Sequence, residues 1–547
     1  MQGLMQSQPL SISALLRHAA RHHGSSEIVS KTVEGDIHRY TWSEAEGRCR
    51  RLSRALQGLG IAAGDRVGTL AWNGYRHLEV YYAVPGMAAV CHTINPRLHP
   101  DDIAYIVNHA GDAVLFAETS FTGLIETIAP HVAGTVRAVV MMTDPAHMPT
   151  LSLPAGMQLL CYDALTDAAG EDYTWPTFDE NTASALCYTS GTTGRPKGVL
   201  YSHRSTVLHA YGVNVADALG LRAVERVLPV VPMFHVNAWG IPYAAAMSGA
   251  SLVMPGRHLD GASLEQLMNQ ERVTMAAGVP TVWMGLLQHL RGSSARLETV
   301  QRIMTGGSAC PPLLIEAFGK EYGVPVEHGW GMTEISPVGT YNKPKPAHQG
   351  LDEVGRLRLG LKQGRILPGL DMKIVDDEGN ELPWDGVAFG DLKVRGPWVT
   401  SAYYGDPPGS AVDADGWFAT GDVATIDPDG VMEITDRSKD VIKSGGEWIS
   451  SIALENIAVS HPDVVEAAVI AARHPKWDER PLLLVVPKPG SAVTPESVLA
   501  LYEDKVAKWW LPDEILVVDE LPHTATGKLQ KTALRSMFQD YYLTKQS

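Results

Sequence analysis

Cysteine is scarce in this chain of 547 residues, and no apolar run reaches the roughly 18 residues that a membrane-spanning helix needs. The five cysteines are scattered and odd in number, and no pair has the spacing of zinc ligands: Cys49, Cys91, Cys161, Cys187 and Cys310. This pattern predicts reduced thiols in a cytoplasmic protein. The amino-terminal residues also lack the basic and long apolar regions of a secretion signal, which agrees with that location.

A net positive charge is missing too. Lys and Arg number 45 against 61 Asp and Glu, which gives a formal net charge of −16. We therefore expect no nucleic-acid partner, although an active site can still be locally cationic. With 45% apolar and 19% charged residues, the composition is that of a globular protein without stable membrane insertion. The length predicts about two to four domains.

Helix-like and strand-like patterns alternate over the first part of the chain. Residues 43–46 have the pattern of a capping box, and residues 78–90 are predicted to form a helix. Strands are predicted at 66–72, 113–117 and 137–142. Such alternation predicts an α/β fold in which helices cover parallel sheets of βαβ type.

The pattern changes in the last third of the chain. From about residue 360, short strands with Asp/Gly turns predict a β subdomain up to residue 436. Beyond it we predict α+β structure with a helix over 452–460, strands over 464–471 and 482–486, and a helix capped by Thr494 that runs to about Trp510. The prediction is an N-terminal domain at 1–436 and a C-terminal domain at 437–547.

The segment Tyr188–Val199 follows an apolar strand pattern and is rich in Gly, Ser and Thr. Glycine lacks a Cβ, so the backbone can approach a polyphosphate closely, and successive N–H groups and hydroxyls can donate to it. The spacing is not that of a Walker A loop, and a solvated linker is the alternative. We predict that the phosphates meet the following residues: Thr189, Ser190, Gly191, Thr192, Thr193 and Gly194, with Arg195 and Lys197 as cations.

Five further motifs follow in order: Met304–Ala309, Glu327–Glu334, Thr420–Asp422, Asp436–Arg437 and Thr524–Lys528. Together with the first segment they resemble the phosphate, adenine, metal, ribose, hinge and catalytic-lysine motifs of adenylate-forming enzymes. That superfamily comprises acyl-CoA synthetases, luciferases and peptide-synthetase adenylation domains, and the resemblance covers about residues 10–540. It implies an AMP-forming acid–thiol ligase of fatty acid metabolism that uses ATP, Mg²⁺ and coenzyme A.

The resemblance assigns the reaction chemistry to a few residues. Activation brings a carboxylate and ATP together, so charge must be stabilised on the transferring group. Lys528 is the implied cation, and Glu334 is the implied Mg²⁺ ligand with Thr192. Thr333 would form a hydrogen bond with the α-phosphate or with metal-bound water. The alternatives are a surface lysine for Lys528 and a helix-start carboxylate for Glu334.

The remaining nucleotide contacts are implied by the same motifs. Asp422 would accept both ribose hydroxyls with Arg437 as a nearby donor, unless Asp422 is a turn residue. Trp330 stands where the family commonly has Tyr, so it keeps the stacking surface for adenine and loses a hydroxyl. The other implied contacts are Gly307, Ser308, Ala309, His328, Gly329, Gly331, Met332 and Ile434.

Transfer to coenzyme A needs a mobile C-terminal domain that presents different groups to the acyl carbon in turn. The resemblance implies a hinge at Lys439 and a loop at 444–450 that lines the pantetheine path. The implied CoA-binding residues are Lys443, Gly445, Gly446, Glu447 and Trp448. A tight turn between domains is the alternative for this loop.

The segment Val231–Gly240 resembles the aromatic gate of long-chain fatty acyl-CoA synthetases, with Trp239 at the gate position. His235 precedes Trp239 by one turn of a right-handed helix, so both are expected to face the acyl carboxylate, together with Gly306. A buried core tryptophan is the alternative for Trp239.

Three acid classes remain open from the sequence. The chain resembles bacterial medium- and long-chain fatty acyl-CoA synthetases, and it shares His-x3-Trp and Gly-Gly-Glu-Trp with 3-methylmercaptopropionate-CoA ligases. Aryl acids stay open. A non-catalytic nucleotide-binding relative would be expected to lack Lys528 or Glu334, and a peptide-synthetase module would need a carrier domain after residue 547. A homodimer is expected only from the family.

Overall fold

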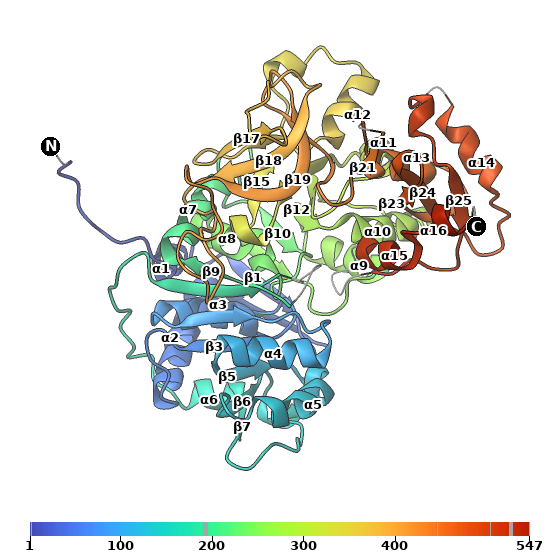
Figure 1. The fold of residues 1–547 in the computed structure, drawn as a ribbon. Coiled ribbons are helices and arrows are strands. Elements are labelled where there is room, and N and C mark those ends of the chain that lie inside the picture. Colours follow the sequence, from blue (N-terminus) through green and yellow to red (C-terminus); the bar gives the residue numbers. More distant parts are fainter. Residues whose placement is uncertain (2, 190–194, 446, 504, 524–528, 546–547) are drawn as a thin grey trace. The chain divides into compact units, whose positions relative to one another are not determined.

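The computed structural model describes residues 1, 3–189, 195–445, 447–503, 505–523 and 529–545, without the side chains of Glu447 and Trp448. The chain forms two compact units (Figure 1). Unit 1 comprises the described residues of Met1–Gly191, Arg195–Asp371 and Arg395–Phe418, and unit 2 those of Met372–Val394 and Ala419–Ser547. Most of the predicted β subdomain thus groups with the C-terminal residues, and the boundary at 436/437 stays a prediction.

Unit 1 contains two large sheets, as the alternating pattern predicted. The seven-stranded sheet has the order β7-β6-β5-β3-β4-β8-β9 and is parallel except for the β8–β9 pair. Its strands are β3 (Arg66–Leu70), β4 (Val90–Thr93), β5 (Asp112–Ala117), β6 (Ala138–Met141), β7 (Gln158–Cys161), β8 (Ala183–Tyr188) and β9 (Gly198–Ser202).

The nine-stranded sheet has the order β16-β15-β14-β13-β12-β10-β11-β1-β2, with a parallel centre and antiparallel pairs at both edges. Its strands are β1 (Glu27–Lys31), β2 (Ile37–Thr41), β10 (Arg226–Pro229), β11 (Ser251–Met254), β12 (Met275–Gly278), β13 (Arg302–Thr305), β14 (Val326–Gly331), β15 (Val338–Tyr341) and β16 (Arg365–Ile366). Parallel strands bring their carboxyl ends to one edge, where β13 and β14 lead into the predicted adenine and metal motifs.

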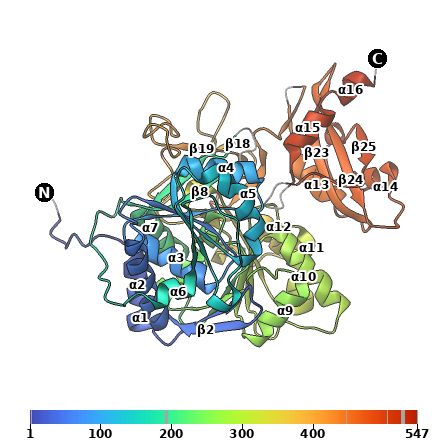
Figure 2. The same cartoon turned by 90° about the horizontal axis from the view of Figure 1, so that it is seen from below.

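Helices cover the sheets of unit 1: α1 (Ile12–His22), α2 (Trp42–Gly58), α3 (Tyr75–Gly86), α4 (Pro100–Ala110), α5 (Thr122–Val132), α6 (Tyr162–Asp167), α7 (His203–Val213), α8 (Ile241–Ser248), α9 (Gly261–Gln270), α10 (Pro280–Gly292), α11 (Pro312–Tyr322) and α12 (Glu353–Leu361). Helices α9, α10 and α11 lie side by side (Figure 2).

Two helix starts or ends differ from the sequence prediction. The capping box of α2 is formed by Thr41 and Glu44, because β2 runs directly into the buried Trp42 as the first helical residue. Helix α3 ends at Gly86, and Val90 already pairs with Arg66 in the parallel sheet. Where a continuous apolar run is buried on all sides, its sequence shows no periodicity, so the end of the helix cannot be distinguished from the start of the next strand.

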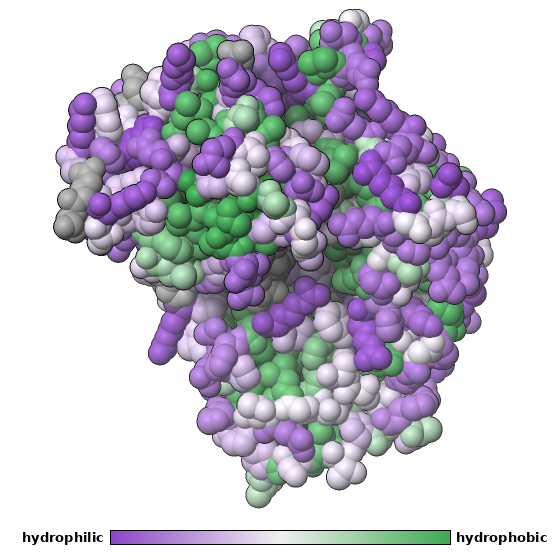
Figure 3. Space-filling view, turned by 90° about the vertical axis from the view of Figure 1, so that its right-hand side faces the viewer, coloured by the Kyte–Doolittle hydropathy of each residue, from purple (hydrophilic) through white to green (hydrophobic). Residues whose placement is uncertain are grey.

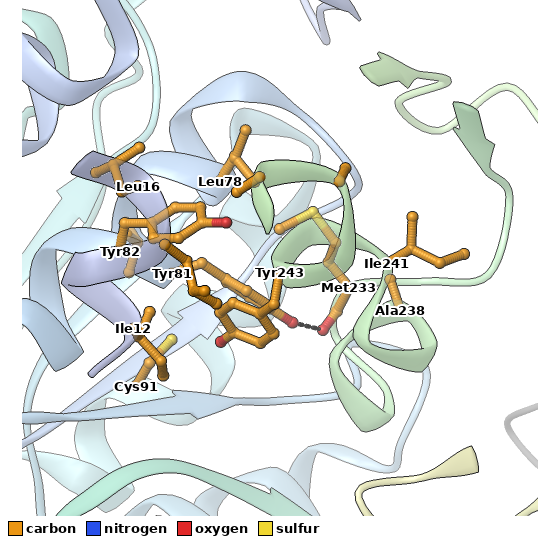
Figure 4. Packing of buried hydrophobic residues seen from close by; sticks show 14 of the residues in the cluster. Ile12, Leu16, Leu78, Tyr81, Tyr82, Cys91, Met233, Ala238, Ile241 and Tyr243 are labelled. Carbon is orange, nitrogen blue, oxygen red and sulfur yellow. Dashed lines mark hydrogen bonds between the residues drawn. The ribbon is translucent and has the colours of Figure 1, made fainter. Parts of the chain in front are cut away.

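The main core of unit 1 lies between α3 and α8 (Figure 4). The rings of Tyr81 and Tyr243 stack with their centroids 5.8 Å apart, and Tyr82 donates to the carbonyl of Pro242 at 2.8 Å. Tyr81 donates to the carbonyl of Met233. The segment that precedes α8 is therefore attached to the core by tyrosine hydroxyls.

Unit 2 holds a four-stranded sheet in the order β17-β18-β19-β20. Its strands are β17 (Asp371–Val375), β18 (Phe389–Arg395), β19 (Phe418–Ile426) and β20 (Met432–Arg437). Gly430 adopts φ +76° in the β19–β20 hairpin, and Asp427 N–H donates to Val431 at 3.1 Å, which confirms the predicted Asp-Pro-Asp-Gly turn.

A five-stranded sheet forms the rest of unit 2, with β22-β21-β24-β23 in order and β25 beside β24. Its elements are β21 (Ile442–Ser444), β22 (Glu447–Ile449), α13 (Ser451–Ala458), β23 (Val464–His474), β24 (Asp478–Pro487), α14 (Pro495–Leu499), β25 (Glu514–Val517), α15 (Lys531–Phe538) and α16 (Tyr541–Thr544). Thr494 caps α14 as predicted. The helix ends at Leu499, however, because Tyr502 turns into the core and donates to the carbonyl of Leu454 at 2.7 Å.

The surface is largely hydrophilic on the face drawn in Figure 3, with hydrophobic residues exposed in places. All five cysteines are free thiols, as predicted. Among the described helices, none combines the length and the apolar character that crossing a bilayer requires.

Candidate active site

The predicted metal motif sits on a short 3₁₀ turn, Thr333–Ile335, directly after β14. Thr333 and Glu334 are both buried. Tyr201 donates to the carbonyl of Thr333 at 2.6 Å, and the N–H of Thr400 donates to the carbonyl of Glu334 at 2.7 Å. Two hydrogen bonds therefore fix the backbone of the motif, and the orientation of the Glu334 carboxylate depends on side-chain contacts.

Tyr403 connects this motif to the Gly-rich segment. Its hydroxyl donates to Glu334 Oε1 at 2.9 Å, and Lys197 Nζ lies 4.7 Å from its ring centroid. Burial and the charge of Glu334 raise the pKa of Tyr403 above its usual value, so the phenol stays a donor. Tyr403 therefore links Lys197, which is predicted to bind phosphate, to Glu334, which is predicted to bind the metal ion. The sequence did not single out this tyrosine.

The two ends of the Gly-rich segment are paired. Thr189 N–H donates to the carbonyl of Lys197 at 2.9 Å. A Cβ on Gly198 would lie 3.0–3.1 Å from side-chain atoms of Leu186, Tyr188 and Tyr404, so a larger residue at this crossing would require these side chains to shift. Arg195 stacks on Tyr105 with its Cζ 4.7 Å from the ring centroid. The predicted phosphate contacts Ser190, Gly191, Thr192, Thr193 and Gly194 lie outside the described residues.

The predicted adenine segment begins where β13 ends. Gly306 is buried, and a Cβ on it would lie 2.7 Å from the carbonyl oxygen of Gly329 in β14. Gly307 adopts φ +81°, which glycine tolerates, and it is exposed together with Ser308 and Ala309. The adenine and metal motifs therefore touch backbone to backbone, with an exposed edge available to a ligand.

His328 and Trp330 lie on β14 in buried positions. Burial lowers the pKa of His328 to about 4, so the imidazole is neutral, and its Nδ1 lies 3.0 Å from the carbonyl of Leu361, to which it donates. A Cβ on Gly339 would lie 2.7 Å from the Trp330 ring. Gly331 is equally confined, because a Cβ there would meet Pro337, whose carbonyl accepts from Met332 N–H at 3.0 Å.

The predicted right-handed relation between His235 and Trp239 is wrong. Val236, Asn237, Ala238 and Trp239 have φ of 41°, 52°, 47° and 57°, so the chain makes a left-handed turn before α8. This gate turn (236–240) is strained, since each non-glycine residue in this region costs about 1–2 kcal/mol. A hydrophobic pattern cannot reveal a reversed hand, which only the surrounding contacts impose.

The tip of the gate turn contacts the adenine segment. A Cβ on Gly306 would lie 3.4 Å from Trp239 Cη2, and one on Gly307 would lie 3.9 Å from Trp239 Cζ2. Trp239 is only 9% exposed, while His235 is partly buried at the start of the turn. The structure therefore brings together Trp239 and Gly306, two residues predicted to meet the acid.

Sequence reasoning missed His209 on α7. Its Nε2 accepts from Val338 N–H at 3.1 Å, directly after the metal motif, and a Cβ on Gly240 would lie 2.6 Å from its ring. Burial lowers its pKa to about 3, so it is neutral. No motif marks this histidine, since its role depends on two segments that meet only in the fold.

Asn73 follows the strand predicted at 66–72 and bonds to the chain before the gate turn. Its side-chain amide donates to the carbonyls of Pro229 and Val231 at 2.7 and 2.8 Å, and its Oδ1 accepts from Met233 N–H at 2.7 Å. It thereby fixes the path of the chain that leads into the gate turn.

In unit 2 the predicted ribose pair is formed. Asp422 on β19 lies opposite Arg437 on β20, and Arg437 Nε lies 2.8 Å from Asp422 Oδ1. Asp422 is 2% exposed and its N–H donates to Thr420 Oγ1 at 3.1 Å. Ile434 lies on the same strand as Arg437 and is partly buried.

The predicted pantetheine loop is a β-hairpin rather than a loop. Lys443 pairs with Trp448 across β21 and β22, and Gly445 adopts φ +61° in the turn, which favours glycine. Lys443 N–H donates to Glu479 at 2.8 Å. Gly446, the side chains of Glu447 and Trp448, and Lys528 lie outside the described residues.

A cavity of about 510 Å³ opens beside this hairpin, lined by Ser444, Gly445, Trp477, Arg480, Trp509 and Asp513. Arg480 is 8% exposed and forms a two-pronged pair with Asp513 at 2.6 and 2.9 Å. Trp477 and Trp509 are each 43% exposed. Rigid walls with exposed indole faces suit a flat ligand group.

The predicted metal site rests on one described carboxylate, that of Glu334. Within the described part of the chain, no group of three or more His, Cys, Asp and Glu side chains is arranged to hold a metal ion. Glu334 therefore fits a hard cation that is bound mainly through phosphates and water.

Comparison with known proteins agrees with this geometry. The chain is 52% identical over 540 residues to a 3-methylmercaptopropionyl-CoA ligase of Ruegeria lacuscaerulensis, covering 99% of both chains. It is 51% identical to a medium-chain-fatty-acid–CoA ligase of Ectopseudomonas oleovorans, covering 100% of this chain and 99% of the relative. Among solved structures, an anthranilate CoA ligase in complex with anthranoyl-AMP matches with a TM-score of 0.85 at 25% identity, over 97% of this chain and 99% of that one.

Two sequence profiles cover most of the chain. The AMP-binding enzyme profile matches residues 15–404, and the AMP-binding enzyme C-terminal domain profile matches residues 453–528. The first range holds the Gly-rich segment, the gate turn and the metal motif, and the second ends at the predicted catalytic lysine. The chain therefore belongs to the AMP-binding enzyme family and is an AMP-forming acid–thiol ligase that binds ATP.

Proposed function

We propose that this ligase activates a medium- to long-chain fatty acid as its acyl-adenylate and transfers the acyl group to coenzyme A. The position of the Trp239 indole beside Gly306 and Gly307 carries this proposal, because an aromatic gate is expected next to the predicted nucleotide segment. The 51% identity to a medium-chain-fatty-acid–CoA ligase supports the acid class.

The first step joins two anions. A carboxylate oxygen of the acid attacks the α-phosphorus of ATP, the bond to the β-phosphate breaks, and pyrophosphate leaves. Lys528 would offset charge on the carboxylate and α-phosphate, and Lys197 charge on the other phosphates. Glu334 would hold Mg²⁺ together with Thr192, and that ion supplies further charge compensation to the phosphates. Tyr403 orients the Glu334 carboxylate through its hydroxyl.

The second step transfers the acyl group to sulfur. The thiol of coenzyme A attacks the acyl carbon, the bond to AMP breaks, and the thiol proton is released. We place the nucleotide end of coenzyme A at the cavity beside the β21–β22 hairpin, where Trp477 and Trp509 offer stacking surfaces for a purine. Domain rotation about Lys439 would bring the hairpin to the acyl carbon.

A second candidate acid is the short thioether 3-methylmercaptopropionate. The core behind the gate turn is filled by Tyr81, Tyr82 and Tyr243, all fully buried (Figure 4). An acyl chain that extended from Trp239 along α8 would meet these rings and need space that they occupy. The 52% identity to a 3-methylmercaptopropionyl-CoA ligase supports the same alternative.

A pyrophosphate-release screen with ATP, Mg²⁺ and coenzyme A separates the candidates. The acids would be saturated fatty acids of increasing length, 3-methylmercaptopropionate and benzoate. The highest kcat/KM on medium or long chains supports the main proposal, and the highest on the thioether acid supports the second. The absence of pyrophosphate release with every acid would contradict both.

A cytoplasmic location and a homodimer stay predictions from the sequence. The free state of all five cysteines agrees with the first. Light scattering of the purified protein tests the second.

A further inference from the structure

Helix α15 begins at Lys531, three residues after the predicted catalytic Lys528. The chain on either side of residues 524–528 is tied together, since His523 and Leu529 form a β-bridge and Gln530 N–H donates to Pro522 at 2.8 Å. His523 Nε2 also lies 3.1 Å from Glu466 Oε1. The stem is therefore fixed on one side by the His523–Glu466 pair and on the other by the start of α15.

Lys531 holds the start of α15 in a buried polar cluster. Its Nζ lies 2.7 Å from Glu455 Oε1 and donates to Ser451 Oγ at 2.6 Å, and its side chain is only 11% exposed. Burial alone would lower the pKa of Lys531, but the charges of Glu455 and Asp436 raise it above its usual value. The side chain is thus an ammonium whose donors point at fixed acceptors on α13.

The same cluster contains the strand that leads into the predicted hinge. Asp436 is 1% exposed, and its carboxylate accepts from Ser451 N–H at 2.5 Å and from Ser451 Oγ at 3.0 Å. One turn after Lys531, Arg535 pairs with Asp440. Helix α15 is therefore joined directly to Asp440 after Lys439 and, through Ser451, to Asp436 before it.

We infer that Lys531 is a positioning residue for adenylate formation: it fixes α15, and the stem before it, to the hinge strand through Glu455, Ser451 and Asp436. The inference rests on the proposed function, in which Lys528 acts in the first half-reaction and not in the second. Misplacing a charged group by about 1 Å can cost on the order of 100-fold in rate. The expected signature is a selective loss of the first half-reaction.

The test compares Lys531→Met, Lys531→Arg and the control Lys545→Met, which removes an exposed, ion-paired lysine from the same unit. Pyrophosphate release measures the first half-reaction, and thioester formation from a supplied acyl-adenylate measures the second. We expect Lys531→Met to lower kcat for pyrophosphate release on the order of 100-fold, with little change in KM for ATP. Thioester formation should be nearly unchanged. Lys531→Arg should restore most of the loss, and Lys545→Met should change neither reaction.

Lys531→Met leaves buried carboxylates without their cationic partner, which can destabilise the fold. The double variant Lys531→Met/Glu455→Gln removes one positive and one negative charge together and therefore provides a second test. A selective loss of pyrophosphate release in this folded variant supports the inference. The inference would be overturned if both half-reactions were lost equally and the melting temperature fell with them. Full activity of either variant would overturn it as well. An unaltered protein that forms no adenylate overturns the proposed function instead, and the inference with it.

Discussion

Two segments that carry predicted active-site residues are held in place by different forces. Around Glu334 in unit 1 the contacts of the described residues include uncharged groups: the Tyr403 hydroxyl, the neutral His209 and backbone N–H groups. Around the hinge in unit 2 they are ionic, with Lys531 against Glu455 and Arg535 against Asp440.

This difference matches what each segment is expected to do. Hydrogen bonds that involve uncharged donors each contribute about 1 kcal/mol, and several of them together hold a segment in place. A buried ion pair is different, because removing one partner leaves an uncompensated charge and costs about 3–5 kcal/mol. The hinge region of unit 2 is therefore restricted to arrangements that keep its charges paired.

The largest effect is expected from Lys528→Ala, which removes the cation that unit 2 is predicted to supply. We expect adenylate formation to fall on the order of 1,000-fold, because one charge at the reacting phosphoryl group is lost. Thioester formation from a supplied acyl-adenylate should be nearly unchanged. Pyrophosphate and thioester assays on the same preparation measure both rates, and equal losses would contradict the division of labour between the half-reactions.

Glu334→Gln tests the corresponding charge in unit 1. It should lower kcat/KM for pyrophosphate release on the order of 100-fold and raise the Mg²⁺ concentration required, because an amide is a weak ligand for this ion. Tyr403→Phe is the matched control, since it removes one hydrogen bond to the carboxylate but no charge and should cost about tenfold or less. A Mg²⁺ titration of each variant provides the comparison, and a larger effect of Tyr403→Phe would show that orientation outweighs charge.

Trp239→Ala probes the strained gate turn. Its indole lies against Gly306 and Gly307, so its removal should open space beside the predicted acyl site. We expect preference among fatty acids of different length to shift by about tenfold, a value typical for one or two methylenes in an apolar pocket. An unchanged length profile, measured by kcat/KM, would mean that Trp239 only packs in the core.

The smallest effect is expected in how the free energy of unfolding depends on pH. His209 has a folded pKa of about 3 against the ordinary 6.5, so its contribution is present above pH 6.5 and is lost as the pH falls towards 3. Between pH 6.5 and 5 this loss amounts to roughly 1.5 kcal/mol, because only the unfolded chain takes up the proton. His209→Gln keeps an acceptor for Val338 N–H and should flatten the dependence of unfolding free energy on pH. Denaturant melts at the two pH values measure this, and an unaltered slope would contradict it.

Much of the fold was predictable because its patterns are local. Strands such as 113–117, the Asp-Gly turns and the Thr494 cap follow from residues close together in sequence, and all are present. The predictions failed where distant residues decide: the start of α2 beside β2, the end of α14 at the buried Tyr502 and the left-handed gate turn. In each case a tertiary contact outweighs the local preference.

The sequence by itself determined the class of reaction, since six motifs in order resemble those of adenylate-forming enzymes and the family match agrees with them. Only the tertiary structure decided which side chains orient them. Tyr403 on Glu334, His209 beneath Gly240 and Lys531 in its carboxylate cluster join segments that lie far apart along the chain. Local periodicity reports neighbours within a turn or a strand, whereas these contacts depend on how sheets and helices pack.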